Sequence, residues 1–354
     1  MPALSAMLIR LFLASIAALS LSFAAASPAR AQKIPMVDAH SQADRGVALS
    51  SLLRLMDQGG VARTILSSRG GWSPADFVAT FAQRPDRVTP SMEVKSQKYF
   101  ITGEPEFYRR LEAMGREPRY GAISEVLLWH ERKGGQGGRR AQESSGGGRG
   151  QGGGRGEGRA RGEARGDGQG GEEVPEVNLP IDAPQVQAVL QMALKRDWPF
   201  TVHYEFRSLK KADYAARMAE LKRLLRAYPD HPIVLIHMGQ LYASEAAALI
   251  AEFPNIYFMT SHANPVFDSV GGGLGWTKLF AGRAITPAWK SLFTAHPERF
   301  ILAFDNVLSR HWEPGFYLAQ AKLWQDALRD LPVEVAHSIA HRNAERLWRL
   351  PPVE

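Results

Sequence analysis

Two short apolar segments that each end on a histidine constrain the fold of this chain most strongly. Pro199-Phe-Thr-Val-His203 and Pro232-Ile-Val-Leu-Ile-His237 are β-branched runs of strand length, and each loses its apolar character at its histidine. The segment between them repeats apolar residues at helical spacing, with Lys and Arg at the other positions. A strand-helix-strand unit makes the two strands parallel, with both carboxyl ends at one edge of a sheet. We therefore expect His203 and His237 to point into one site.

The same alternation of short strands and amphipathic helices continues along the chain. Eight strands are predicted, near Ile34–Gln42, Val61–Ser67, Val88–Val94, Tyr120–Trp129, Pro199–His203, Pro232–His237, Ile256–Ser261 and Arg299–Asn306. This regular pattern predicts a single α/β domain, a (β/α)8 TIM barrel whose functional residues lie at the carboxyl ends of the strands. A doubly wound open sheet is the alternative.

The first 31 residues have the pattern of a secretory signal peptide. A lone Arg10 precedes an apolar run (11–26), and Ala29-Arg-Ala31 has the small-residue pattern of a cleavage site. The apolar run is short for a full bilayer span, so an uncleaved membrane anchor is the weaker alternative. We expect residues 1–31 to be removed and the mature barrel, residues 32–354, to be exported to the periplasm or secreted without stable membrane insertion.

A segment rich in glycine and arginine interrupts the barrel pattern at residues 133–173. It has almost no apolar residues, so it cannot bury enough surface to offset the entropy lost when a chain becomes ordered. We therefore expect a disordered, low-complexity insertion after the fourth strand. A spacer without function is the favoured interpretation, and a weak contact with anionic polymers is the alternative.

The composition excludes several kinds of chemistry. The chain has no cysteine, so it can form no disulfide and has no thiolate nucleophile or thiolate metal ligand. Its net charge of +7 fits a solvated basic surface, and no recognised nucleic-acid-binding motif accompanies that charge. We expect no nucleic-acid partner, and any metal ion must be held by histidine, carboxylate or amide groups.

Polar side chains recur at the predicted strand ends, where a barrel would bring them together. His40 follows the first strand, Glu125 lies within the fourth, and the fifth, sixth and eighth end at His203, His237 and Asp305. Imidazole and carboxylate groups suit Zn²⁺ or a similar divalent ion, and such an ion lowers the pKa of its bound water toward about 7. Each residue alone has an ordinary structural explanation, but their joint position predicts a metal centre.

Several segments occur in the order of motifs known from one enzyme group. Val37-Asp-Ala-His40-Ser-Gln42 is similar to a first-strand His-x-His motif, and Leu302-Ala-Phe-Asp305 to an eighth-strand aspartate. The two histidine strands and the closing Arg342-Asn-Ala-Glu-Arg-Leu347 match in the same way. The mature chain apart from its insertion thus resembles the metal-dependent hydrolases of the amidohydrolase superfamily, particularly the amidohydrolase-2 branch that includes aminocarboxymuconate semialdehyde decarboxylase.

The resemblance implies roles for four of these residues. His40, His203 and Asp305 would bind the metal ion, and His237 would be the base or polarising group beside the bound water. Asp305 would also share in proton transfer.

Two further residues depart from the pattern of that branch or extend it. Gln42 stands where the branch has its second histidine, and an amide oxygen is a weaker Zn²⁺ ligand than imidazole, so Mn²⁺ or another divalent ion is an alternative to zinc. Glu125 lies in a run similar to a ligand-bearing strand of TatD-type deoxyribonucleases. It is either a ligand or part of a buried ion pair with a neighbouring Lys or Arg.

The resemblance implies an exported hydrolase in which a metal-activated water attacks an amide, lactone or ester bond of a small molecule. A non-oxidative decarboxylase on the same fold is the second enzymatic interpretation. A degenerate barrel that only binds envelope polymers is the non-enzymatic alternative. Loops at the predicted mouth suggest substrate contacts by Trp276, Lys278, His262 and His311.

Overall fold

The computed structural model describes residues 33–95, 98–131, 176–267 and 277–353. The predicted signal peptide, the low-complexity insertion and Trp276 lie outside these residues. Among the described helices, none combines the length and the apolar composition needed to span a membrane.

Parallel strands form the wall of a barrel, in two hydrogen-bonded sheets. The first sheet contains, in spatial order, β1 (Met36–Ala43), β2 (Val61–Ser68), β3 (Val88–Met92) and β4 (Ala122–Ile123). The second contains β12 (Phe300–Ile301), β9 (Ile256–Met259), β8 (Ile233–Leu235), β7 (Phe200–Tyr204), β5 (Val126–His130) and the short antiparallel β6 (Val177–Asn178).

The two sheets join at both seams into a closed barrel. At one seam the backbone N–H of Ala39 donates to the carbonyl of Leu302 (3.0 Å), and that of Asp305 to the carbonyl of His40 (2.7 Å). At the other seam β4 pairs with β3 and β5 pairs with β7, so these two short strands share the fourth position of the wall. The predicted (β/α)8 barrel is therefore confirmed, except that its fourth strand is broken at Ser124 and Glu125.

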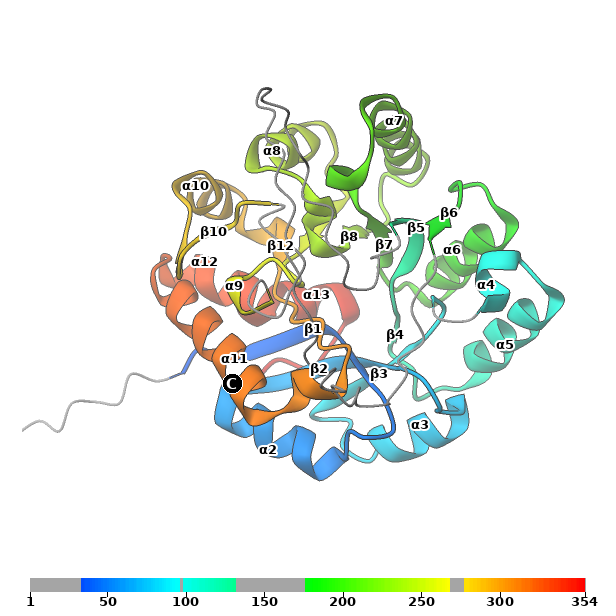
Figure 1. Ribbon diagram of the computed structural model, residues 1–354, viewed down its shortest axis with the longest axis horizontal. Coiled ribbons are helices and arrows are strands. Elements are labelled where there is room, and N and C mark those ends of the chain that lie inside the picture. The colour runs from blue at the N-terminus through cyan, green and yellow to red at the C-terminus, as the bar shows by residue number, and fades with distance from the viewer. Residues whose placement is uncertain (1–32, 96–97, 132–175, 268–276, 354) are drawn as a thin grey trace, which may run out of the picture. The chain divides into compact units, whose positions relative to one another are not determined.

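Helices surround the strands as an outer ring (Figure 1). They are α2 (Leu49–Gly59), α3 (Pro74–Phe81), α4 (Lys98–Thr102), α5 (Pro105–Arg116), α6 (Pro184–Arg196), α7 (Lys211–Ala227), α8 (Ala243–Glu252), α10 (Pro287–Ala295) and α11 (Pro314–Arg329). Local sequence explains their boundaries: the Ser73 hydroxyl accepts from the backbone N–H of Asp76 (3.1 Å) and caps α3, as predicted, with Pro74 in the first turn.

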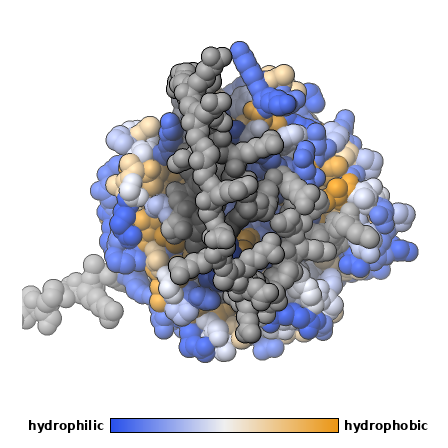
Figure 2. All heavy atoms as spheres, in the orientation of Figure 1, coloured by the Kyte–Doolittle hydropathy of each residue, from blue (hydrophilic) through white to orange (hydrophobic). Residues whose placement is uncertain are grey.

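Shorter elements complete the described chain. They are α9 (Pro265–Phe267), the β10 (Phe280–Ala281) and β11 (Ala284–Ile285) hairpin, 3₁₀ turns at Phe206–Ser208, Ile236–Gln240, Pro297–Arg299 and Ser309–Trp312, α12 (Val333–His337), one π turn at Ser338–Arg342 and α13 (Asn343–Trp348). Figure 2 shows that the side chains at the rim of the face seen in Figure 1 are mostly hydrophilic. In the described part of the chain Val333 is the large hydrophobic residue that remains strongly exposed.

The last helix, α13, closes the amino-terminal end of the barrel. Its Ala344, Leu347 and Trp348 pack into one core with inward-facing strand residues, and Figure 1 shows α13 near the middle of the ring. The Asn343 amide donates to the carbonyls of Pro297 and Phe300, both 2.7 Å away, at the beginning of β12. Since apolar side chains fill the interior from this end, polar chemistry is left to the carboxyl ends of the strands.

Candidate metal centre

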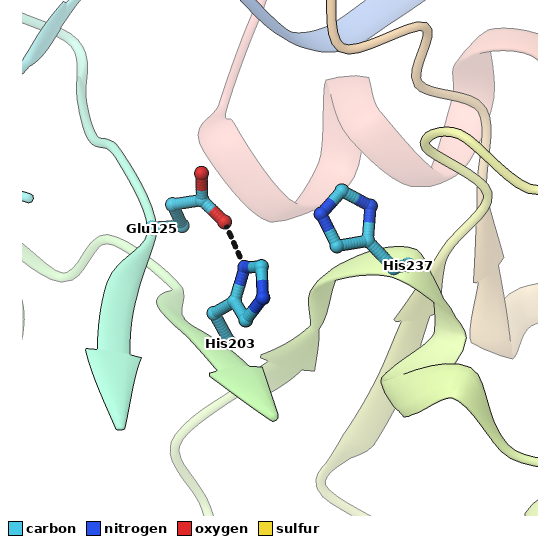
Figure 3. Close-up of side chains that lie close together, drawn as sticks. All are labelled: Glu125, His203 and His237. Carbon is cyan, nitrogen blue, oxygen red and sulfur yellow. Dashed lines mark hydrogen bonds and ion pairs between the residues drawn. The ribbon is translucent and has the colours of Figure 1, made fainter. Parts of the chain in front are cut away.

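Side chains from five separate parts of the barrel wall meet at the carboxyl ends of the strands. Asp305 Oδ1 lies 3.3 Å from His40 Nε2, and Asp305 Oδ2 lies 3.6 Å from His237 Nε2. Glu125 Oε2 lies 2.7 Å from His203 Nδ1, and Glu125 Oε1 lies 3.6 Å from His40 Nε2. Figure 3 shows Glu125, His203 and His237 turned toward one another. The structure thus brings together the five residues that the strand ends suggested.

His262 is a sixth member of this cluster. Its Nε2 lies 3.3 Å from Asp305 Oδ2 and 2.9 Å from the Asp305 carbonyl oxygen, and its ring stacks on that of His237 with centroids 4.7 Å apart. The sequence suggested a substrate contact for His262 from its loop position. The structure places it beside the proposed ligands themselves.

The cluster contains several groups of side chains suited to a divalent ion. In each of three overlapping sets, one ligand atom per residue lies within 4.8 Å of the others: His40, Glu125 and Asp305; Glu125, His203 and His237; His237, His262 and Asp305. His40 Nε2 is buried and makes no hydrogen bond to any described residue, although it faces two carboxylate oxygens. An imidazole nitrogen that faces two carboxylate oxygens needs a cation or a proton between them, so these residues fit a divalent metal ion.

The backbone is left-handed at three members of the cluster. The φ angles are 51° at His237, 55° at His262 and 58° at Asp305, in a region that residues other than glycine rarely adopt. Strand β8 consequently ends at Leu235, two residues before the predicted strand end, and the chain turns sharply at His237. Strained backbone of this kind persists where the surrounding structure imposes it, and it is concentrated at functional sites.

Hydrogen bonds fix the orientation of the His237 ring. Its Nδ1 lies 3.1 Å from the Ser261 carbonyl oxygen, and its backbone N–H donates to the Ser261 hydroxyl (3.0 Å). The Ser261 hydroxyl lies at the same distance of 3.1 Å from Nδ1. A carbonyl oxygen only accepts, so the contact with it favours the tautomer that has the proton on Nδ1 and a lone pair on Nε2, which faces Asp305. His237 is therefore oriented as a ligand or a base would be.

Glu205, which the sequence analysis missed, lies against the Nε2 atom of His203. Its Oε1 lies 3.3 Å from His203 Nε2 and 3.2 Å from His130 Nδ1, and its Oε2 accepts from the backbone N–H of Glu131 (2.9 Å). Burial alone would raise the pKa of Glu205, but the hydrogen bonds from His130 and His203 lower it well below its usual range. The one sequence signal was its position two residues after His203.

Asp38 lies under the cluster and joins three segments of the wall. Its carboxylate accepts from the backbone N–H of Phe304 (2.8 Å) and of His40 (3.3 Å), and from the hydroxyls of Ser41 (2.6 Å) and Thr64 (3.2 Å). Burial raises its pKa to about 6 in spite of these bonds. Asp38 thus holds the β1 backbone at His40 against the segment that carries Asp305.

Gln42 does not present its amide oxygen to the cluster. That oxygen accepts from Arg69 Nη1 (3.3 Å), and the amide nitrogen donates to Asp305 Oδ1 (3.4 Å). Because an arginine can only donate, this orientation of the amide follows from its neighbours. In this arrangement Gln42 is a hydrogen-bond donor to Asp305, whereas the sequence suggested a metal ligand.

The Asp305 carboxylate is ionised among these neighbours. Burial alone would raise its pKa, but the nearby positive charges of His262 and His40 lower that pKa well below the usual value. An ionised carboxylate approached by several imidazole nitrogens is a suitable centre for a cation site.

The remaining predicted substrate residues within the described part of the chain are His311 and Lys278. His311 is buried, accepts from the backbone N–H of Val307 (3.1 Å) and stacks on Phe316; burial lowers its pKa to about 3, so it is neutral. Lys278 is exposed, with its ammonium 5.2 Å from the centre of the Tyr242 ring. Neither shows a described hydrogen bond to the cluster residues.

Comparisons with solved structures give three similar chains at low sequence identity. An uncharacterised TIM-barrel protein from Bordetella bronchiseptica is 14% identical, with a TM-score of 0.49 over 86% of this chain and 83% of that one. A probable 2-pyrone-4,6-dicarboxylic acid hydrolase from Acinetobacter baumannii is 11% identical, with 0.46 over 89% and 99%. A dihydroorotase from Campylobacter jejuni is 13% identical, with 0.49 over 91% and 85%.

The sequence itself matches one family. None of the curated proteins matches the chain significantly. Residues 160–350, more than half of the chain, match the amidohydrolase family model, and this range contains His203, His237, His262 and Asp305. The predicted family is therefore confirmed, and the chain belongs to the amidohydrolase family.

Proposed function

We propose that this chain is a metal-dependent hydrolase that cleaves an amide, lactone or ester bond of a small molecule. The observation that carries the proposal is the ionised Asp305 carboxylate, which three imidazole Nε2 atoms, of His40, His237 and His262, approach within 3.3 to 3.6 Å. When bound there, a divalent ion would supply Lewis acidity toward a water molecule and a substrate carbonyl. Zinc is the proposed ion, with manganese as the alternative.

The residues of the chain have separate tasks in this proposal. His40 and Asp305 hold the ion together with imidazoles from the other strand ends. His237 Nε2, whose lone pair faces Asp305, takes up a proton from the attacking water, and Asp305 shares that proton. Gln42 donates to Asp305 Oδ1 and so keeps the carboxylate in place. The Glu205 carboxylate contacts His203 Nε2 and so keeps this ring in one orientation.

A non-oxidative decarboxylase is the second candidate. The Arg69 guanidinium donates to the Gln42 amide oxygen at the edge of the cluster, so a cationic side chain borders the site. Such a group suits a substrate that carries a carboxylate. Release of CO₂ without net addition of water would favour decarboxylation over hydrolysis.

Removing the metal ion tests the proposed function directly. Dialysis of purified protein against a chelator is expected to abolish turnover of a panel of amides, lactones and esters, and Zn²⁺ or Mn²⁺ should restore it. His40→Ala should lower the metal content measured by elemental analysis, because it removes one of the proposed ligands. His296→Ala, which changes a histidine at the end of α10, is the matched control and should keep both metal and turnover.

Two results would contradict the proposal. Full turnover by the metal-depleted protein would exclude a metal-dependent reaction. Protein that carries no metal and turns over no substrate, yet binds anionic polymers, would favour the non-catalytic barrel instead.

We further propose that the mature protein is exported. The proposal is supported by the first 31 residues, which combine an apolar run with an Ala-x-Ala site. N-terminal sequencing of protein recovered outside the cytoplasm should begin at Gln32, whereas an intact Met1 on the functional protein would contradict cleavage.

A further inference from the structure

One cationic side chain is buried inside the candidate metal centre. Lys95 follows β3 and is only 7% exposed, and its ammonium forms an ion pair with Glu125 Oε1. Glu125 is itself fully buried. The sequence analysis left Glu125 as either a metal ligand or the partner of a buried Lys or Arg, and the structure shows the ion pair.

Both oxygens of Glu125 face groups of the cluster. Oε1 faces Lys95 and lies 3.6 Å from His40 Nε2, and Oε2 lies 2.7 Å from His203 Nδ1. A buried carboxylate needs its charge compensated, and a buried ammonium does too. The opposite charges of Lys95 and Glu125 compensate each other. The Glu125 carboxylate can therefore stay charged while buried without a bound metal ion.

The ammonium pairs with an oxygen that belongs to one group of potential ligands and not to another. A divalent ion held by His40, Glu125 and Asp305 would lie about 2.1 Å from Glu125 Oε1. With a charged hydrogen bond of about 2.8 Å from Lys95 to that same oxygen, the ion and the ammonium would be at most about 5 Å apart. At this distance in a site with little water, two cations repel each other strongly. The group formed by His237, His262 and Asp305 does not include the oxygen that Lys95 occupies.

We propose that Lys95 takes the place of one metal ion, so that the centre binds a single divalent ion, at Asp305 and not at the Glu125 oxygen that Lys95 occupies. This inference rests on the proposed metal-dependent function and adds the number and position of the ions. It also gives Glu125 the role of a positioning residue, which orients His203 through Nδ1 and carries the charge that Lys95 balances.

The number of bound ions tests this inference without an activity assay. Wild-type protein titrated with Zn²⁺ and with Mn²⁺ in a calorimeter, with elemental analysis after dialysis, should bind one ion per chain. Lys95→Met has a side chain of similar length without the charge, and it should bind a second ion. Lys95→Arg keeps the charge and should remain at one ion, and Lys322→Met, on an exposed face of α11, should match wild type.

The outcomes separate this inference from the proposed function. Two ions in the wild-type protein, or one ion in both wild type and Lys95→Met, would overturn the role of Lys95 while leaving a metal-dependent hydrolase intact. No ion in wild type would contradict both the metal dependence and the single ion inferred here, whatever Lys95→Met binds. If Lys95→Met fails to fold, as circular dichroism would show, the wild-type count and the position of the ion in a metal-soaked crystal still decide.

Discussion

Replacing Asp305 by asparagine is expected to lower the affinity for Zn²⁺ or Mn²⁺ by at least about 100-fold, with a corresponding loss of turnover. Substitution of groups that merely support metal ligands already costs about 10- to 100-fold, and Asp305 lies closer to the proposed ion than such groups do. Its two oxygens face His40, His237 and His262, so the substitution removes the central negative charge of the cluster. Titration calorimetry with each ion measures the effect.

Asparagine is a suitable replacement because the backbone at Asp305 is left-handed, with φ of 58°. Asparagine and aspartate adopt this region more readily than other residues with a side chain, so Asp305→Asn should keep the fold and remove only the charge. Asp330→Asn, at an exposed aspartate after α11, is the matched control and should bind the ion like wild type. Unchanged affinity in Asp305→Asn would remove Asp305 from the ligand set.

Replacing Asp38 by alanine is expected to lower the free energy of unfolding by about 4 kcal/mol. The carboxylate accepts four hydrogen bonds from buried groups on β1, on β2 and at Phe304, and alanine leaves all four donors without it. Each buried donor left unsatisfied costs about 1–3 kcal/mol, and relaxation of the site recovers part of the sum. Urea unfolding of the metal-free proteins, followed by circular dichroism, measures the difference.

Two further variants are the controls for Asp38→Ala. Asp38→Asn keeps the shape and most acceptor capacity, so it should cost clearly less than alanine. Asp230→Ala changes an exposed aspartate in the loop before β8 and should stay within about 0.5 kcal/mol of wild type. A cost below about 1 kcal/mol for Asp38→Ala would show that this carboxylate does not hold the barrel seam together.

Much of the fold could be predicted because each strand is a local signal. The apolar runs before His203 and His237 have strand length, and the segments between strands have helical spacing, so the order of elements follows from periodicity alone. The break of the fourth strand at Glu125 could not be predicted in this way. At the break, Glu125 contacts Lys95 and His203, which lie on neighbouring segments of the wall and far away in the sequence.

The candidate site was predictable only in part, for a related reason. Parallel strands share one edge, so residues at strand ends, such as His40 and Asp305, could be placed together from their positions in the sequence. Lys95, Glu205 and His262 follow their strands in loops, where no repeating pattern indicates the direction of a side chain. Their places were known only once the loops were folded over the cluster.

The sequence by itself determined the family, the alternation of strands and helices, and the edge of the barrel at which chemistry can occur. Tertiary structure alone decided that Gln42 donates to Asp305, that His262 lies beside His237, and that a lysine is buried among the proposed ligands. Periodicity is a property of residues close in the chain, whereas the charge balance of a buried cluster depends on groups that only folding brings within a few ångströms of one another.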